Sequence, residues 1–357
     1  MLALKRLRIE FPAFDLLLKT IESTVVQSVK SGPDHIVTHS GTFHCDEALA
    51  CALLKSLPEY KDKPICRTRD NQLIDAGGLV VDVGAIFEVE RKRFDHHQRG
   101  FTECFNSNKK IKLSSAGLIY KYYGKNILKS LLPENFHNYV DVLYLKLYED
   151  FIEHIDGIDN GVESYENGEK NYRVTTTLSS RVSRLFPRKD SGDKNEENER
   201  FREAMELTAT EFCDSLNYLV QEWLPARSSV QLAMEKATSI HPTGDILKLD
   251  QSLPWKGHLI ELEGYLNCKG KFKFVLFPDG TNWRVQAIPP VGDPEGFGMR
   301  VPLKKEWQGL RDEELSKASG IPDCIFVHAT GFIGGNKTYQ GALEMALKSV
   351  EASGQNN

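Results

Sequence analysis

The segment Phe94-Asp95-His96-His97-Gln98-Arg99-Gly100 decides how the rest of the chain is interpreted. A carboxylate followed by two imidazoles can hold a metal ion, a phosphate, or both. A polar loop with two hydrogen-bonded histidines would have the same sequence, so this segment alone leaves both interpretations open. Segments 38–47, 80–84 and 156–161 favour the first, because each places Asp or His where an apolar element meets a glycine-bearing loop. Four such places in one domain are not typical of a solvated surface.

Composition bounds the class of protein. The chain has 357 residues, of which 40% are hydrophobic and 27% charged, and its formal net charge is −5. These values are typical of about two folded domains and exclude wholesale disorder. The mild acidity argues against a protein that coats duplex nucleic acid, although an enzyme that takes one strand end into a metal-lined cleft needs only a local basic groove. No apolar run reaches the roughly 20 residues that span a bilayer.

The seven cysteines are scattered and include no Cys-x-x-Cys pair. This argues against a structural zinc site of that kind and favours free thiols in a reducing compartment. At the N-terminus, residues 1–9 carry three basic residues and no acid between apolar ones, as a mitochondrial presequence does. An ordinary N-terminal helix is the alternative for this segment.

Hydrophobic patterns predict an α/β protein. Apolar runs at 36–38, 64–68 and 79–83 predict buried strands, and 47–57, a segment starting at Ser114 or Ser115, and 138–154 predict helices. This alternation predicts a parallel sheet with helices on both faces. A long helix after about residue 200 is expected to lead into a smaller mixed α+β domain, with strands at 258–263, 272–277, 283–288 and 324–328. We therefore expect an N-terminal extension (1–34), a catalytic domain (35–187), a linker with a bridging helix (188–240), a substrate-binding domain (241–350) and a tail (351–357).

Imidazole and carboxylate groups without a thiolate favour Mn²⁺ or Mg²⁺ over a closed zinc site. The surplus of candidates suggests two ions, with Asp82 placed to bridge them, His97 free to face a substrate phosphate, and Asp95 able to orient a neighbouring imidazole. The carboxyl ends of parallel strands are where such ligands collect. A Cys45 nucleophile is a remote alternative. The candidate metal ligands are His39, His44, Asp46, Asp82, His96 and Asp159, with Asp156 in reserve.

A second group of candidates concerns the substrate. Residues 331–335 read as a glycine-rich strand-turn-helix junction, whose backbone N–H groups could hold a phosphate, although a plain turn has the same sequence. Arg284 could contact a phosphate or form a salt bridge within its strand. The substrate-binding candidates are Arg99, Arg284, His328, Gly331, Gly334, Gly335 and Lys337.

These residues resemble the DHH phosphoesterase superfamily, which includes single-strand exonucleases, manganese pyrophosphatases and cyclic-dinucleotide phosphodiesterases. The resemblance is closer to one branch, the melanocyte-proliferating-gene (MYG) exonuclease family, and covers residues 35–350 in order. The segments that carry it are 39–50 (HSGTFHCDEALA), 94–99 (FDHHQR), 112–119 (KLSSAGLI), 159–161 (DNG), 175–179 (TTTLS), 223–227 (WLPAR) and 326–335 (FVHATGFIGG).

The resemblance implies a DHH-type catalytic domain in a metal-dependent hydrolase, a 3′-to-5′ exonuclease that acts on single-stranded RNA. It implies two divalent ions, Mn²⁺ or Mg²⁺, and sites of action in the mitochondrial matrix and nucleus, with the cytoplasm as a further location. His39 and Asp82 would hold one ion, and the other would be held by Asp46, Asp82, His96 and Asp159. His44 stands where the wider superfamily usually has an aspartate, and the spacing from its first histidine is one residue longer here.

Two alternatives stay open at this point. One is a phosphohydrolase for a small molecule such as pyrophosphate or a short oligonucleotide. The other is an inactive protein that binds RNA or nucleotides. The sequence predicts no membrane segment and leaves the oligomeric state open.

Overall fold

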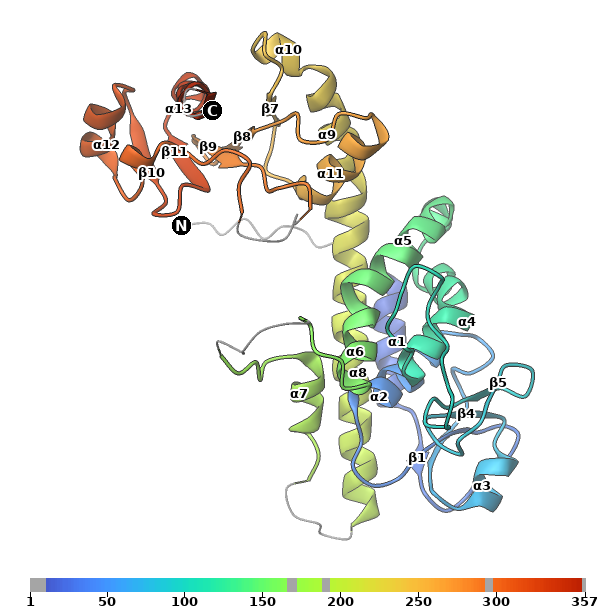
Figure 1. The fold of residues 1–357 in the computed structure, drawn as a ribbon. Coiled ribbons are helices and arrows are strands. Elements are labelled where there is room, and N and C mark those ends of the chain that lie inside the picture. The colour runs from blue at the N-terminus through green and yellow to red at the C-terminus, as the bar shows by residue number, and fades with distance from the viewer. Residues whose placement is uncertain (1–10, 166–171, 188–192, 293–297, 355–357) are drawn as a thin grey trace. The chain divides into compact units, whose positions relative to one another are not determined.

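The structure is a computed structural model that describes residues 11–165, 172–187, 193–292 and 298–354 (Figure 1). The chain divides into two compact units, residues 1–219 and 220–357. The boundary falls inside the segment 188–240, which the sequence predicts to be a linker with a bridging helix.

The first unit contains a six-stranded sheet. All neighbouring strands are parallel except the edge pair β5 and β6. The parallel sheet predicted from the apolar runs is therefore present. Its order is β1 (Val26–Gln27), β3 (Ile65–Arg67), β2 (Ile36–Thr38), β4 (Leu79–Val81), β6 (Arg93–Phe94) and β5 (Phe87–Glu88).

Both faces of this sheet are covered. Ile74 of α3 (Asn71–Ala76) packs in a cluster with Val37, Cys66 and Val80 on one face. Their sequence neighbours Ile36, Ile65 and Val81 point the other way and are also fully buried. Helices α2 (Cys45–Leu54) and α4 (Ser115–Leu131) pack together and contact β4 and β6. Every residue of α2 is buried, including Asp46 and Glu47.

Several other helices complete the first unit. Helix α1 (Pro12–Glu22) buries Phe14, Leu17 and Ile21 and contacts α4 and α8, so this part of the expected N-terminal extension is packed into the unit. The basic residues of the presequence-like pattern lie outside the described residues. The remaining helices are a 3₁₀ turn (Glu134–Tyr139), α5 (Val140–Leu147), a π-helix (Tyr148–Ile152), α6 (Glu153–Asp159), α7 (Leu178–Ser183) and α8 (Lys194–Tyr218). The single helix predicted at 138–154 is thus interrupted by the π-helix and extends to Asp159.

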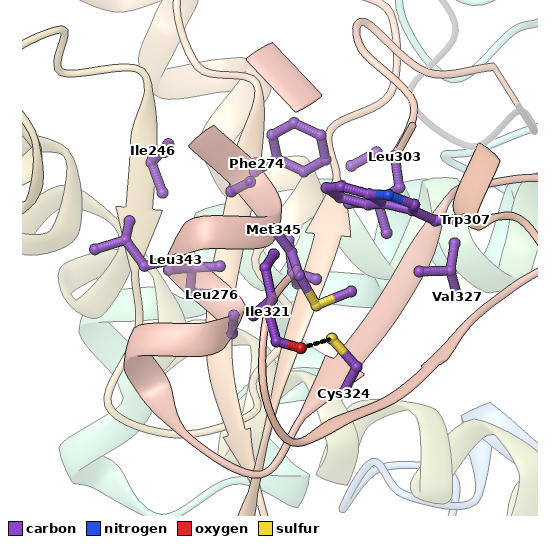
Figure 2. Packing of buried hydrophobic residues seen from close by; sticks show 14 of the residues in the cluster. Ile246, Phe274, Leu276, Leu303, Trp307, Ile321, Cys324, Val327, Leu343 and Met345 are labelled. Carbon is purple, nitrogen blue, oxygen red and sulfur yellow. Dashed lines mark hydrogen bonds between the residues drawn. The ribbon is translucent and has the colours of Figure 1, made fainter. Parts of the chain in front are cut away.

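The second unit is built on a five-stranded sheet in which only β7 and β8 are parallel. Its order is β10 (Cys324–Val327), β11 (Ile333–Asn336), β9 (Asn282–Ala287), β8 (Phe274–Asp279) and β7 (Ile246–Lys248). Figure 2 shows side chains of these strands packed against Trp307 and Met345. The helices around them are a π-helix (Leu219–Trp223), α9 (Leu224–Glu235), α10 (Ala237–Ile240), α11 (Lys256–Tyr265), a 3₁₀ turn (Lys305–Trp307), α12 (Asp312–Ser319) and α13 (Tyr339–Gly354).

The strand predicted at 258–263 is wrong, because this segment forms helix α11. Leu259 and Leu262 lie three residues apart on its buried face. His258 Nε2 donates to the carbonyl of Trp223 (2.8 Å), and Glu263 forms a double ion pair with Arg300 (2.6 and 2.7 Å). Trp223 and Arg300 thus satisfy the buried polar groups of His258 and Glu263. The sequence pattern around 258–263 does not show these partners, because they are far away in the chain. No helix among the described residues is long and apolar enough to cross a membrane.

Candidate metal-dependent active site

The candidate ligands converge at the carboxyl ends of three adjacent parallel strands. His39 directly follows β2, Asp82 follows β4, and Asp95 and His96 follow β6. Parallel neighbours end at the same edge of a sheet, which brings these side chains together. Asp46, from the first turn of α2, and Asp159, from the last turn of α6, reach the same place.

One group of side chains surrounds His39. Its Nε2 lies 2.9 Å from Glu47 Oε1 and 3.3 Å from Asp82 Oδ2. Burial opposes protonation of this imidazole, but the hydrogen bonds with Asp82 and Glu47 raise the pKa of His39 to about 10. The His44 side chain is exposed, and its ring centroid lies 5.7 Å from that of His39. The two carboxylates therefore favour positive charge at this position.

A second group surrounds His96. Its Nε2 lies 3.2 Å from Asp82 Oδ1, 3.2 Å from Asp159 Oδ2 and 3.9 Å from Asp46 Oδ2. The two oxygens of Asp82 are thus divided between the two groups. Ser115 Oγ also donates to Asp82 Oδ1 at 3.0 Å. Burial alone would raise the pKa of Asp82, but its hydrogen bonds with His39 and His96 hold that pKa below the ordinary value.

The residues fit a hard divalent cation. Asp46 is only 1% exposed, and neither of its carboxylate oxygens has a hydrogen-bond partner among the described residues. Burial, with the carboxylates of Asp82, Asp159 and Glu47 nearby, raises the pKa of Asp46. A buried carboxylate without a partner is costly, and a cation would satisfy it. Burial also raises the pKa of the Cys45 thiol to about 12, which disfavours it as a nucleophile or metal ligand.

Asp95 holds His97 in place. Its Oδ1 lies 2.8 Å from His97 Nδ1 and accepts from the His97 backbone N–H at 3.1 Å, while Oδ2 accepts from the Ala85 N–H at 2.6 Å. Burial opposes ionisation of Asp95, but these hydrogen bonds keep its pKa low. The hydrogen bond that His97 donates to Asp95 raises the pKa of His97, against a smaller effect of burial. The His97 side chain is 60% exposed, in contrast to 7% for His96. The two adjacent imidazoles therefore have different surroundings.

An open cleft of about 620 Å³ lies over the second group and is lined by His44, His96, His97 and Asp159. Around these residues the lining is rich in hydrogen-bond donors, with two cations that could contact a phosphate. The polar residues of this rim are Gln98, Arg99, Lys112, Asn160, Ser179 and Ser183.

Asp156 is engaged elsewhere. Its Oδ1 accepts from Ser114 N (2.9 Å) and Ser114 Oγ (2.7 Å), and its Oδ2 accepts from Tyr148 Oη (3.0 Å). Burial raises the pKa of Asp156 to about 7 despite these donors. A Cβ at Gly117 would lie 2.3 Å from Asp156 Oδ1, so the carboxylate packs against the start of α4. The structure thus gives Asp156 a packing role and places it in none of the groups that could share an ion.

The glycine-rich segment is a β-hairpin, which corrects the predicted strand-turn-helix junction. Gly331 (φ +79°) turns the chain between antiparallel β10 and β11, Gly334 and Gly335 lie within β11, and α13 begins only at Tyr339. A Cβ at Gly334 would lie 2.9 Å from Leu303 Cδ1 and Met345 Cε. Close packing therefore explains a glycine at this position.

The charged candidates of the second unit have partners of their own. Arg284 Nη2 pairs with Asp279 at 2.5 Å, whereas its Nη1 is buried without a hydrogen-bond partner. Lys337 Nζ lies 3.7 Å from Asp323 Oδ1, and exposed His328 shares a hydrogen bond with Thr330 Oγ1 (3.0 Å). Arg284 therefore forms the salt bridge that was one of its two predicted roles, and its Nη1 has no hydrogen-bond partner among the described residues.

Sequence reasoning missed several contributors to the site. Ser115 supports Asp82, and Ser179 and Ser183 line the cleft from α7. It also assigned no role to Glu47, which is fully buried beside His39. A signal was available, because Glu47 follows His44 at capping-box spacing and is followed by an apolar run in the same helix.

Comparison with known proteins identifies the family. The model of the MYG1 exonuclease family, described as an uncharacterised protein family (UPF0160), matches residues 35–350. The chain is 50% identical to a MYG1 protein of Dictyostelium discoideum over 321 residues, which cover 89% of this chain and 97% of that protein. It is 48% identical to MYG1 exonuclease of Bos taurus and 47% identical to that of Homo sapiens, over 89% of this chain and 85% and 86% of theirs.

Likeness to solved structures is weak. The manganese complex of RecJ from Thermus thermophilus matches with 14% identity and a TM-score of 0.23, over 100% of this chain and 55% of RecJ. A match at that level carries no argument about this site. The family model and the sequence relatives, in contrast, cover most of the chain, and the protein therefore belongs to the MYG1 exonuclease family.

Proposed function

We propose that this protein is a metal-dependent exonuclease that digests single-stranded RNA from its 3′ end. The observation that carries the proposal is the division of the two Asp82 oxygens between the His39 and His96 groups, beside a buried Asp46 that has no hydrogen-bond partner among the described residues. Such an arrangement suits two divalent cations that share one carboxylate. The names of the Bos taurus and Homo sapiens relatives support an exonuclease. RNA as the substrate and 3′-to-5′ polarity rest on the family resemblance.

The ligands divide between two ions. His39 and Asp82 would hold one Mn²⁺ or Mg²⁺ ion, and Asp46, Asp82, His96 and Asp159 would hold the other. His44 lies within reach of both groups. A pair of bound divalent ions supplies a hydroxide at neutral pH and stabilises the charge of a phosphoryl displacement.

The remaining residues of the site would act on the substrate directly. Asp95 fixes the ring of His97 through Nδ1, which leaves Nε2 of this exposed imidazole for a phosphate oxygen. Arg99 and Lys112, on the rim of the cleft, would attract the phosphate backbone of a single strand. A hydrogen bond from His97 that strengthens as negative charge develops on the phosphate would lower the activation barrier more than it tightens substrate binding.

The second unit is proposed to add substrate affinity. Arg284 is one candidate for a phosphate contact there, and its buried Nη1 beside Gly335 would have to become accessible to make it. His328, Gly331, Gly335 and Lys337 are the other candidates on the β10–β11 hairpin and its flanks, whereas packing against Leu303 and Met345 accounts for Gly334. By resemblance, we propose the mitochondrial matrix and the nucleus as the sites of action.

Digestion of a single-stranded RNA labelled at its 5′ end tests the proposal. With Mn²⁺ present, a 3′-to-5′ exonuclease produces a ladder of labelled fragments that shorten one nucleotide at a time. Immediate release of the labelled nucleotide would instead show the opposite polarity. The Asp82→Asn variant serves as the inactive control, and a DNA strand of the same sequence tests the preference for RNA.

Two other results would replace the proposal. Hydrolysis of pyrophosphate or dinucleotides without digestion of longer RNA would identify a small-molecule phosphohydrolase. Binding of RNA without hydrolysis, in protein shown to contain metal, would identify an inactive RNA-binding protein.

A further inference from the structure

We propose that Glu47 is a direct ligand of the ion held by His39 and Asp82. Without it, this group would offer a divalent cation only one carboxylate, that of Asp82, which is shared with the other group. The inference rests on the proposed two-ion site, and it deepens that proposal by completing the ligand set of one centre.

The distances match those between neighbouring ligands of one ion. Glu47 Oε1 and Asp82 Oδ2 lie 2.9 and 3.3 Å from His39 Nε2. An octahedral ion with bonds of about 2.0–2.1 Å has adjacent ligand atoms about 2.9 Å apart, as follows from the right angle between them. Ligand atoms of these three residues and of His44 all lie within 4.8 Å of one another. The two distances from His39 Nε2 are thus close to the separation of adjacent ligands, and the whole group is compact enough for one ion.

The two oxygens of Glu47 can serve two purposes. The backbone N–H of His44 lies 2.8 Å from Oε1 and 3.0 Å from Oε2, so Oε2 can accept this hydrogen bond and cap α2. Oε1 is then available to the His39 group. The neighbouring Asp46 offers the His96 group two buried oxygens that have no hydrogen-bond partner among the described residues. The first turn of α2 would therefore supply one carboxylate to each ion.

Capping alone does not explain this arrangement. Asp70 caps α3 by accepting from Gln72 N at 2.8 Å, and it does so as an exposed residue. Glu47 is instead 0% exposed, and a fully buried carboxylate is costly unless it is paired with positive charge. Glu47 lies beside His39, where a bound cation would supply that positive charge. A residue that only caps a helix has no need of such a position.

Metal binding to the full chain tests the inference without reference to activity. Titration calorimetry with Mn²⁺ should show two ions bound by the wild-type protein. Glu47→Gln keeps the size of the side chain and an oxygen to accept from His44 N, so the cap is preserved while the charge is removed. We expect this variant to bind one ion normally and the other more than about 100-fold more weakly, beyond the usual effect of changing a residue that only supports a ligand. Asp70→Asn, which also removes a carboxylate at a helix start, should bind both ions as the wild type does.

The position of the ion in a Mn²⁺-bound crystal of the wild-type protein gives the second measurement. Anomalous scattering that places an ion at bonding distance, about 2.2 Å, from Glu47 Oε1 supports the inference. An ion bound by His39 and Asp82 but more than about 3 Å from both Glu47 oxygens contradicts it, whether or not the variant folds. Unchanged binding of both ions by Glu47→Gln also contradicts it and leaves the proposed function intact. A wild-type protein that binds no Mn²⁺ would overturn both.

Discussion

The two units of this protein place conspicuous residues in contrasting surroundings. In the first unit, Asp46 and Asp82 are buried among like charges and imidazoles, and Asp46 has no hydrogen-bond partner among the described residues. In the second unit, Gly334 lies in a strand where close packing excludes a side chain, and His328 and Lys337 are exposed with local partners. The first set is costly without a ligand, whereas the second is explained by the fold itself. A motif therefore indicates chemistry most strongly where the fold alone leaves its side chains unsatisfied.

Removal of metal should have the largest effect and acts on the first unit alone. Because Asp46 and the His96 group need positive charge to be satisfied, we expect a chelator to abolish digestion of RNA and Mn²⁺ or Mg²⁺ to restore it. The measurement is the rate of nucleotide release before and after dialysis, with metal content determined by mass spectrometry. Full activity in protein verified to be free of metal would refute the two-ion mechanism.

Asp82→Asn should have the next largest effect. The amide cannot offer two anionic oxygens to two groups, so we expect kcat to fall by roughly 10³-fold, as for loss of a major electrostatic element. Steady-state kinetics on the folded variant measures this fall. Asp70→Asn is the matched control and should retain normal turnover. A folded Asp82→Asn protein with near-normal kcat would show that Asp82 does not bridge two ions.

His96→Ala and His97→Ala should differ in kind. His96 faces three carboxylates, so its loss should weaken metal binding, with activity partly recovered at high Mn²⁺. Loss of exposed His97 should leave metal affinity nearly unchanged and lower kcat by about 10²-fold, the usual effect of removing one donor to developing charge. Calorimetry beside kinetics on both variants separates the two outcomes. If His97→Ala loses an ion and His96→Ala keeps both, the roles are reversed.

Gly334→Ala should have the smallest effect on catalysis. Its Cβ would press on Leu303 and Met345, and such overpacking typically costs about 1–3 kcal/mol of folding free energy. We expect urea denaturation to show this loss, with kcat and KM of the folded protein unchanged. Gly257→Ala, where no atom lies within 4 Å of the added Cβ, is the control. A large rise in KM without a loss of stability would instead indicate that the hairpin binds substrate.

The sequence predicted that His39, Asp82 and His96 lie close together because each of them follows a strand of the parallel sheet. Once 36–38 and 79–83 are recognised as buried parallel strands, topology alone brings His39 and Asp82 to one edge. Glu47 was missed because its burial depends on how α2 packs on α4 and α8, which no local pattern shows. The strand prediction for 258–263 was wrong for a similar reason, because the ion pair of Glu263 with Arg300 joins residues far apart in the chain. The glycine-rich hairpin was misassigned because its glycines suit either a tight turn or close packing.

The backbone around Asp82 has a consequence for local motion. Asp82 (φ +58°), Gly84 (φ +95°) and Ala85 (φ +53°) all adopt left-handed conformations, which costs about 1–3 kcal/mol for each residue other than glycine. The turn is held by the bond from Ala85 N–H to Asp95 and by Ser115 on Asp82. The loops after β4 and β6 are thus fastened together, and one cannot relax without releasing the other. Asp82, which both ions would share, and Asp95, which orients His97, should therefore unfold and refold as one cooperative unit. Local unfolding here should displace the proposed ligands and His97 together.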